Sequence, residues 1–343
     1  MDKKESLQLK GIAILMMLFL HLFNRPENVD LCDITLYFWN GKPLVSAMSR
    51  IASFCVPIYI FLSGYGLAIT YEKCTQMNNI NRIFRLYINY WVVFLLFIPL
   101  ACLICPDQYP QDTTNFILNF IAYKSNYNYE WWFLFPYIVL VLCSKHILSF
   151  LYRLDKKRSI KTVILLFIFY ISANLIAKQI KVYLIEYHLL QQLFWVISLS
   201  FMFVCGALFA RYSLFDKIKE HFINSIPSNR KRTLFFLSVL CVLFILRMML
   251  GPSVINPLFV IPFMACFLCM KRPKRLCSFL CYLGHHSTNM WLTHSFFIYY
   301  LFKDTFYGLR YPLVIYVALI LVSLGSSYIV GWINKPVQRI IPK

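Results

Sequence analysis

Long apolar runs alternate with short polar connections along the whole 343-residue chain. Each run approaches the length of about 20 residues that a membrane-spanning helix needs, and no connection is long enough for a separate soluble domain. The runs lie near residues 8–23, 44–70, 82–105, 131–152, 160–178, 189–210, 232–250, 253–270, 278–302 and 312–333. The pattern therefore predicts one all-α integral membrane domain over residues 1–343, with about ten transmembrane helices.

Three local features refine this pattern. Residues 113–122 are apolar but too short to span, which predicts an amphipathic helix in a loop. The ninth run contains Gly284, His285 and His286, where its helix could be broken. The charged first ten residues lead into an apolar run without a small-residue cleavage site, which predicts a retained first helix and not a signal peptide.

The lysines and arginines predict an orientation. Most of the 34 fall at the N-terminus, in the even-numbered connections and at the C-terminus, in clusters such as Arg153–Lys161 and Lys271–Arg275. Because cytoplasmic loops of membrane proteins are enriched in these residues, both termini are predicted to be cytoplasmic.

Composition agrees with a membrane protein. Hydrophobic residues make up 60% of the chain and charged residues 14%, against about 25% charged in soluble domains. The net charge of +20 is distributed in short clusters between apolar runs, which argues against a nucleic-acid partner. Two CxxC pairs, Cys102/Cys105 and Cys266/Cys269, lack the further nearby ligands that zinc requires, so no metal site is expected.

His21 and Lys10 are the first candidates for chemistry. Both lie in the first helix, eleven residues apart, which is about 16 Å along the axis and close to three full turns, so their side chains face the same way. A histidine can take and return a hydroxyl proton near neutral pH. The alternatives are an interfacial histidine that only hydrogen-bonds and a lysine that reaches towards the headgroups.

Other polar residues near the spans form a second group. Arg82 and Arg85 begin the third helix three residues apart and could hold phosphates, although anchoring on the cytoplasmic side explains them equally well. His294, within the ninth run, is a candidate for positioning. Glu130 is the one carboxylate close to a span, beside Trp131 and Trp132, which suit an interfacial aromatic belt.

Four segments together resemble acyltransferase family 3, a family of bacterial membrane proteins that acylate surface glycans. The segments are Leu9-Lys10-Gly11-Ile12-Ala13-Ile14 through Leu20-His21; Phe61-Leu62-Ser63-Gly64-Tyr65; Arg82-Ile83-Phe84-Arg85-Leu86-Tyr87 with Tyr90-Trp91; and Gly284-His285-His286-Ser287 with Met290-Trp291-Leu292-Thr293-His294. They occur in the family's order and span most of the chain. Lys10 departs from the arginine usual in the family, which keeps the charge but loses the planar fork.

The resemblance implies a membrane-bound O-acyltransferase of the bacterial inner membrane. Its expected co-substrate is acetyl-CoA or another acyl-CoA, with no permanently bound cofactor, and its expected acceptor is a hydroxyl of a surface or lipid-linked glycan. His21 is expected to act as the general base, or first to assist delivery of the acyl group, and Lys10, Arg82 and Arg85 to bind the phosphates of the donor. Ser63, Tyr65, Glu130, Trp131 and His294 are expected to position the substrates.

Two functions of other classes stay open. The chain could be a non-catalytic exporter of polysaccharide or lipid, which would have no affinity for acyl-CoA. It could also be a structural membrane partner of a polysaccharide assembly complex, in which case His21 and Lys10 would tolerate replacement.

Overall fold

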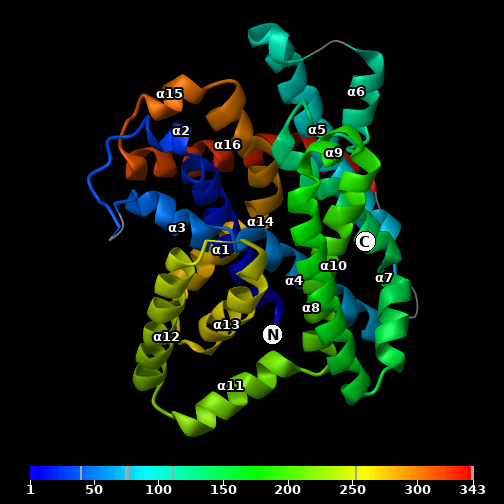
Figure 1. Cartoon of the computed structure of the whole chain (residues 1–343), viewed down its shortest axis with the longest axis vertical. Helices are drawn as coiled ribbons and strands as arrows, with labels where there is room; N and C mark the ends of the chain where they lie inside the picture. The colour runs from blue at the N-terminus through cyan, green and yellow to red at the C-terminus, as the bar shows by residue number, and fades with distance from the viewer. Residues whose placement is uncertain (39–40, 74–76, 110–111, 252, 341–343) are drawn as a thin grey trace. The chain divides into compact units, whose positions relative to one another are not determined.

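The computed structural model describes residues 1–38, 41–73, 77–109, 112–251 and 253–340, and its helices are labelled in Figure 1. Within these ranges the chain is helical and contains no strand, only an isolated bridge between Tyr37 and Pro43. The α-helices are α1 (Lys3–Phe23), α2 (Pro26–Val29), α3 (Leu44–Ala52), α4 (Cys55–Lys73), α5 (Asn79–Ile104), α6 (Thr113–Phe120), α7 (Leu134–Arg153), α8 (Lys156–Gln179), α9 (Lys181–Glu186), α10 (His188–Arg211), α11 (Leu214–Ser225), α12 (Asn229–Met249), α13 (Asn256–Cys269), α14 (Lys274–Ser295), α15 (Lys303–Tyr307) and α16 (Pro312–Ile340). Short 3₁₀ turns cover Pro106–Gln108, Tyr129–Phe133 and Ser253–Ile255, and a π-helical turn covers Phe296–Tyr300.

Eight helical segments of the described chain are long and apolar enough to cross a membrane. They are Lys3–Phe23, Leu44–Lys73, Asn79–Ile104, Tyr129–Arg153, Lys156–Gln179, His188–Arg211, Asn229–Met249 and Pro312–Arg339. Each coincides with one of the ten apolar runs. The chain is therefore an all-helical, multi-pass membrane protein.

The other two predicted spans differ from the expectation. The run at 253–270 forms α13, whose 14 residues extend only about 21 Å, less than the hydrocarbon thickness of about 30 Å. The run at 278–302 forms α14 and the π-helical turn after it; α14 is long enough to span, but its histidines, serines, threonines and Asn289 make it too polar for an apolar span. The possible break at Gly284 is wrong, because α14 continues through it; the irregularity comes later, at the π-helical turn.

The chain divides into two compact units. Unit 1 comprises the described residues of Met1–Ile58, Tyr87–Asp112 and Ile218–Pro342, and unit 2 those of Tyr59–Leu86 and Thr113–Lys217. In unit 1, α1 packs chiefly against α14 and also contacts α3 and α16, and α12 pairs with α13. In unit 2, α10 packs against both α7 and α8.

Helix α1 forms the centre of unit 1. A capping box starts it: the Asp2 carboxylate accepts from the Glu5 amide at 2.7 Å, and the Glu5 carboxylate accepts from the Asp2 amide at 2.9 Å. Its side chains at Leu9, Ala13 and Leu18 are completely buried. The short predicted helix at 113–122 is confirmed as α6.

Candidate functional site

Two glycines set the distance between α1 and α14. A Cβ added at Gly11 would lie 2.1 Å from the carbonyl oxygen of Leu280, and one added at Gly284 would lie 2.1 Å from that of Leu7. No side chain fits into such a gap, so the two backbones touch, as small residues allow between membrane helices. The two helices run in the same direction from this contact.

The contact explains why His21 and His294 meet. His21 follows Gly11 by ten residues and His294 follows Gly284 by ten residues, so both histidines lie about 15 Å beyond the point where the helices touch. Nδ1 of His21 is 2.6 Å from Nε2 of His294, and the two rings stack with their centroids 4.9 Å apart and an angle of 16° between their planes. His294 is completely buried, whereas His21 is partly buried.

The hydrogen bonds determine which nitrogens carry protons in the neutral pair. Nδ1 of His294 lies 2.7 Å from the carbonyl oxygen of Trp291, which can only accept, so this nitrogen carries the hydrogen. Nε2 of His294 is then the acceptor for an N–H at Nδ1 of His21. The lone pair of the His21 ring consequently lies on Nε2, and a proton taken there would create an imidazolium already hydrogen-bonded to His294.

Tyrosines hold the last turns of α1. The hydroxyl of Tyr299, in the π-helical turn, donates to the carbonyl of His21, and the hydroxyl of Tyr307 donates to that of Leu22 at 3.2 Å. These carbonyls belong to the last helical turn, where no backbone donor follows. Burial raises the pKa of Tyr307 above its ordinary value, which keeps the phenol protonated as a donor. The Arg25 guanidinium lies 4.3 Å above the ring of Tyr299. Two side-chain hydrogen bonds therefore hold the backbone that carries His21.

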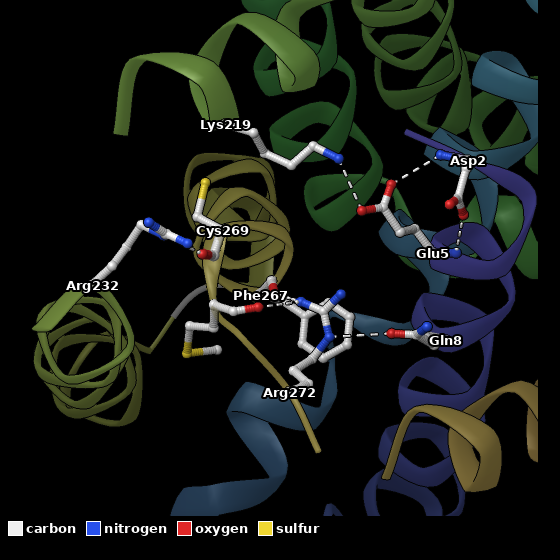
Figure 2. Close-up of polar contacts among 9 residues, drawn as sticks. Asp2, Glu5, Gln8, Lys219, Arg232, Phe267, Cys269 and Arg272 are labelled. Carbon is white, nitrogen blue, oxygen red and sulfur yellow. Dashed lines mark hydrogen bonds and ion pairs between the residues drawn. The ribbon is translucent and has the colours of Figure 1, made fainter. Parts of the chain in front are cut away.

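Lys10 lies about three turns before His21 on the same unbroken helix, so the helical periodicity from which a common face is predicted holds over the whole interval. Its side chain is partly exposed. At this end of α1 several polar contacts join the helix to the rest of unit 1, as Figure 2 shows. The Lys219 ammonium is 2.9 Å from the Glu5 carboxylate, and Nε of Arg272 is 3.1 Å from Oε1 of Gln8.

Two arginines of this group bond mainly to backbone carbonyls. Arg272 donates from Nη1 to the carbonyls of Phe267 and Met270, and its guanidinium lies 4.2 Å above the Phe267 ring. Arg232 donates from Nε to the carbonyl of Cys269 at 3.2 Å and from Nη1 to that of Ile226 at 2.9 Å. Both arginines thus satisfy carbonyls at the end of α13, where helices favour positive charge.

The remaining predicted residues lie in unit 2 and are described there by themselves. Arg82 is exposed and Arg85 partly buried at the start of α5. Ser63 is partly buried, and the Tyr65 side chain is buried, its ring 6.4 Å from that of Phe215.

Gly64, between these two residues, has a packing role. A Cβ there would lie 1.9 Å from the carbonyl oxygen of Phe203, and one at Gly206 would lie 2.0 Å from that of Phe61. The Ser63-Gly64 element is thus the contact between α4 and α10.

Glu130 and Trp131 lie in the 3₁₀ turn that precedes α7. The Glu130 amide donates to the side-chain oxygen of Asn128 at 3.1 Å, and the Glu130 side chain is buried. The prediction that Trp131 belongs to an interfacial belt is wrong, because only 1% of its surface is exposed and it cannot reach lipid headgroups. Trp132 is partly exposed, with its ring 5.1 Å from that of Trp195.

Sequence reasoning ranked His294 below His21 and missed Tyr299 and Tyr307. The equal Gly-to-His spacing of ten residues in two segments was a usable signal for the histidine pair. The tyrosines had no such signal, because Tyr299 lies in the π-helical turn and Tyr307 in α15, where the regular periodicity of α14 has ended.

Comparison with known proteins agrees with the four motifs. The chain matches the family model for acyltransferase family 3, described as an acyltransferase domain, over residues 7–332. No curated protein and no solved structure matches it. Because the match covers nearly the whole chain and both units, the protein belongs to acyltransferase family 3 and is a membrane acyltransferase.

Proposed function

We propose that the protein transfers an acyl group, acetyl by default, from acyl-CoA to a hydroxyl of a surface or lipid-linked glycan. The observation that carries the proposal is the contact between His21 on α1 and His294 on α14, with His21 about three turns from Lys10 along α1. The family membership supports acyl transfer in general.

His21 acts as the general base in this mechanism. Nε2 takes the proton of the acceptor hydroxyl while the hydroxyl oxygen attacks the thioester carbonyl. The tetrahedral intermediate expels the CoA thiolate, which takes the proton back from His21, so one ester and one free thiol are formed. His294 positions the ring and accepts the hydrogen bond from Nδ1, much as a buried partner orients the histidine of a hydrolase triad.

Lys10 binds the CoA phosphates in this proposal. Its distance of about 16 Å from His21 along α1 leaves room for the pantetheine arm between the phosphates and the thioester. Arg82, Arg85, Ser63, Tyr65, Glu130 and Trp131 stay predicted contributors from the sequence. The resemblance to the family implies a bacterial inner-membrane protein. The distribution of Lys and Arg supports termini, and therefore a Lys10 end of α1, that face the cytosol.

The function is tested with membranes that contain or lack the protein, labelled acetyl-CoA and total surface glycan. We expect label in the glycan only when the protein is present, and its release by mild alkali, as an O-ester requires. If the purified protein bound neither acetyl-CoA nor a longer acyl-CoA, the exporter would become the better interpretation.

Lys10→Met tests the donor site, because methionine keeps an apolar side chain and removes the charge. We expect KM for acetyl-CoA to rise about tenfold with kcat nearly unchanged, the effect of losing one charge-assisted contact in the ground state. Lys10→Arg is the matched control and should retain the affinity. An unchanged KM in Lys10→Met would remove Lys10 from the site.

A further inference from the structure

A second polar site lies beside the His21 end of α1. It is a pocket of about 570 Å³, within the range of small-molecule sites. Its wall includes Leu20 and the cap residue Asn24 from the His21 end of α1, together with part of α3 and the end of α12. Asp30 and Lys42 also line it, one carboxylate and one ammonium beside the two arginines of this pocket. All of these residues belong to unit 1.

The wall that α3 contributes is polar, because its polar side chains recur at helical spacing. Ser46, Ser49, Arg50 and Ser53 recur at intervals of three and four residues, so they form a stripe along one face of α3 and its C-terminal cap. The hydroxyls of Ser49 and Ser53 donate to the carbonyls of Ser46 and Arg50, so these two oxygens can serve a sugar only as acceptors. The Ser46 hydroxyl and the Asn24 side chain add groups of the kind that bind sugar hydroxyls.

Two guanidiniums share this pocket. Arg247 is only 1% exposed; its Nε donates to Oδ1 of Asn256 at 2.8 Å and its Nη1 to the carbonyl of Leu250 at 2.6 Å. Arg50 donates from Nη1 to the carbonyl of Met248, the residue next to Arg247, at 2.6 Å. Both arginines line the pocket, and each has further N–H groups beyond those in these bonds.

No described carboxylate forms an ion pair with either arginine. Two cations close together repel each other, and buried cations in proteins are normally paired. A bound anion would supply the missing charge, and a carboxylate or phosphate would match the planar guanidinium with two parallel hydrogen bonds.

We propose that this pocket binds an acidic sugar, with its carboxylate or phosphate against Arg50 and Arg247 and its hydroxyls along the serine stripe. The inference rests on the proposed function, because it identifies the acidic sugar as part of the acyl acceptor. The position of Leu20 and Asn24 places the bound sugar alongside the turn of α1 that carries His21.

The test is direct binding to the full chain in nanodiscs without acyl-CoA, measured by calorimetry. The probes are a glucuronic acid-containing tetrasaccharide, glucose 1-phosphate, a neutral glucose tetrasaccharide and, in the nanodisc, phosphatidylglycerol. We expect saturable binding of the acidic tetrasaccharide or the sugar phosphate, or both, and much weaker binding of the neutral sugar. Competition by phosphatidylglycerol alone, or equal affinity for neutral and acidic sugars, would overturn the proposal.

Arg50→Gln should weaken the binding of the acidic probe about tenfold to a hundredfold, because it removes one charged partner. Arg50→Lys, which keeps the charge without the fork, should fall between this variant and the wild type. Arg158→Gln, at an exposed arginine far along the sequence, is the control for general charge and should bind as the wild type does. Equal affinity in all four proteins would contradict the site.

His21→Ala separates this inference from the proposed function. It should abolish acyl transfer while leaving sugar binding intact. If binding depended on Arg50 but no acyl transfer were found, the acidic-sugar site would stand and the enzymatic role would fail.

Discussion

Cationic side chains from other segments surround both ends of α1, but they make different contacts at the two ends. At the Lys10 end, Arg232 and Arg272 spend their donors on backbone carbonyls and Lys219 is paired with Glu5 (Figure 2). At the His21 end, Arg50 and Arg247 also donate to backbone carbonyls, those of Met248 and Leu250, but both line one pocket of about 570 Å³, and neither forms an ion pair with a described carboxylate. The difference teaches that a cation near a membrane-helix end indicates a ligand only when its neighbours leave its donors available.

The glycine contact between α1 and α14 should show the largest effect on stability and activity when it is changed. Gly284→Ala places a Cβ 2.1 Å from the Leu7 carbonyl oxygen, so α1 and α14 must separate. We expect a loss of more than about 3 kcal/mol of stability, and loss of acyl transfer in any protein that still folds, because the histidines no longer meet. Thermal unfolding in detergent measures the first effect and the transfer assay the second.

Gly325→Ala is the matched control for this change. An added Cβ at Gly325, on α16, meets no atom within 4 Å, so the better helix former should leave stability equal or slightly higher. Equal behaviour of the two variants would mean that the close approach of α1 and α14 does not matter.

Arg272→Ala tests the structural character of the Lys10 end. It removes the donors for the Phe267 and Met270 carbonyls and the stacking on the Phe267 ring. We expect a loss of about 2–4 kcal/mol of stability but normal acyl transfer per folded molecule. Lys271→Ala, at the exposed neighbouring side chain, should unfold like the wild type. A rise in KM or a fall in kcat at unchanged stability would instead give Arg272 a functional role.

Substitutions of His294 test a functional role at the His21 end, whereas Arg272→Ala tests a structural one. His294→Leu removes the acceptor at Nε2, and we expect acyl transfer to fall about tenfold to a hundredfold, the value of one hydrogen bond to a charged group. His294→Gln can place an oxygen where Nε2 was, so it should recover most of the rate. If the leucine and glutamine variants were equally slow, His294 would act by packing and not by accepting the hydrogen bond.

The sequence predicted whatever depends on one helix at a time. Apolar length located the spans, and helical periodicity placed Lys10 and His21 on one face. The prediction of spans from apolar runs failed at two places: α13 is shorter than a membrane span, and α14 is more polar than one. The roles of His294, Tyr299 and Arg247 depend on contacts between distant segments. Arg50 contacts the backbone next to Arg247 across more than 190 residues, and His294 and Tyr299 each contact His21 across more than 270 residues. Periodicity carries no information about such contacts.

The most direct test of the account compares two histidine substitutions in nanodiscs, with acetyl-CoA and surface glycan as substrates. His21→Ala removes the proposed base, and His285→Ala makes the same chemical change at an exposed position of α14. We predict that His21→Ala lowers the rate of O-ester formation by about 10²–10⁴, as loss of a general base does, while His285→Ala transfers acyl groups at the wild-type rate. Normal transfer by folded His21→Ala protein would contradict the central claim.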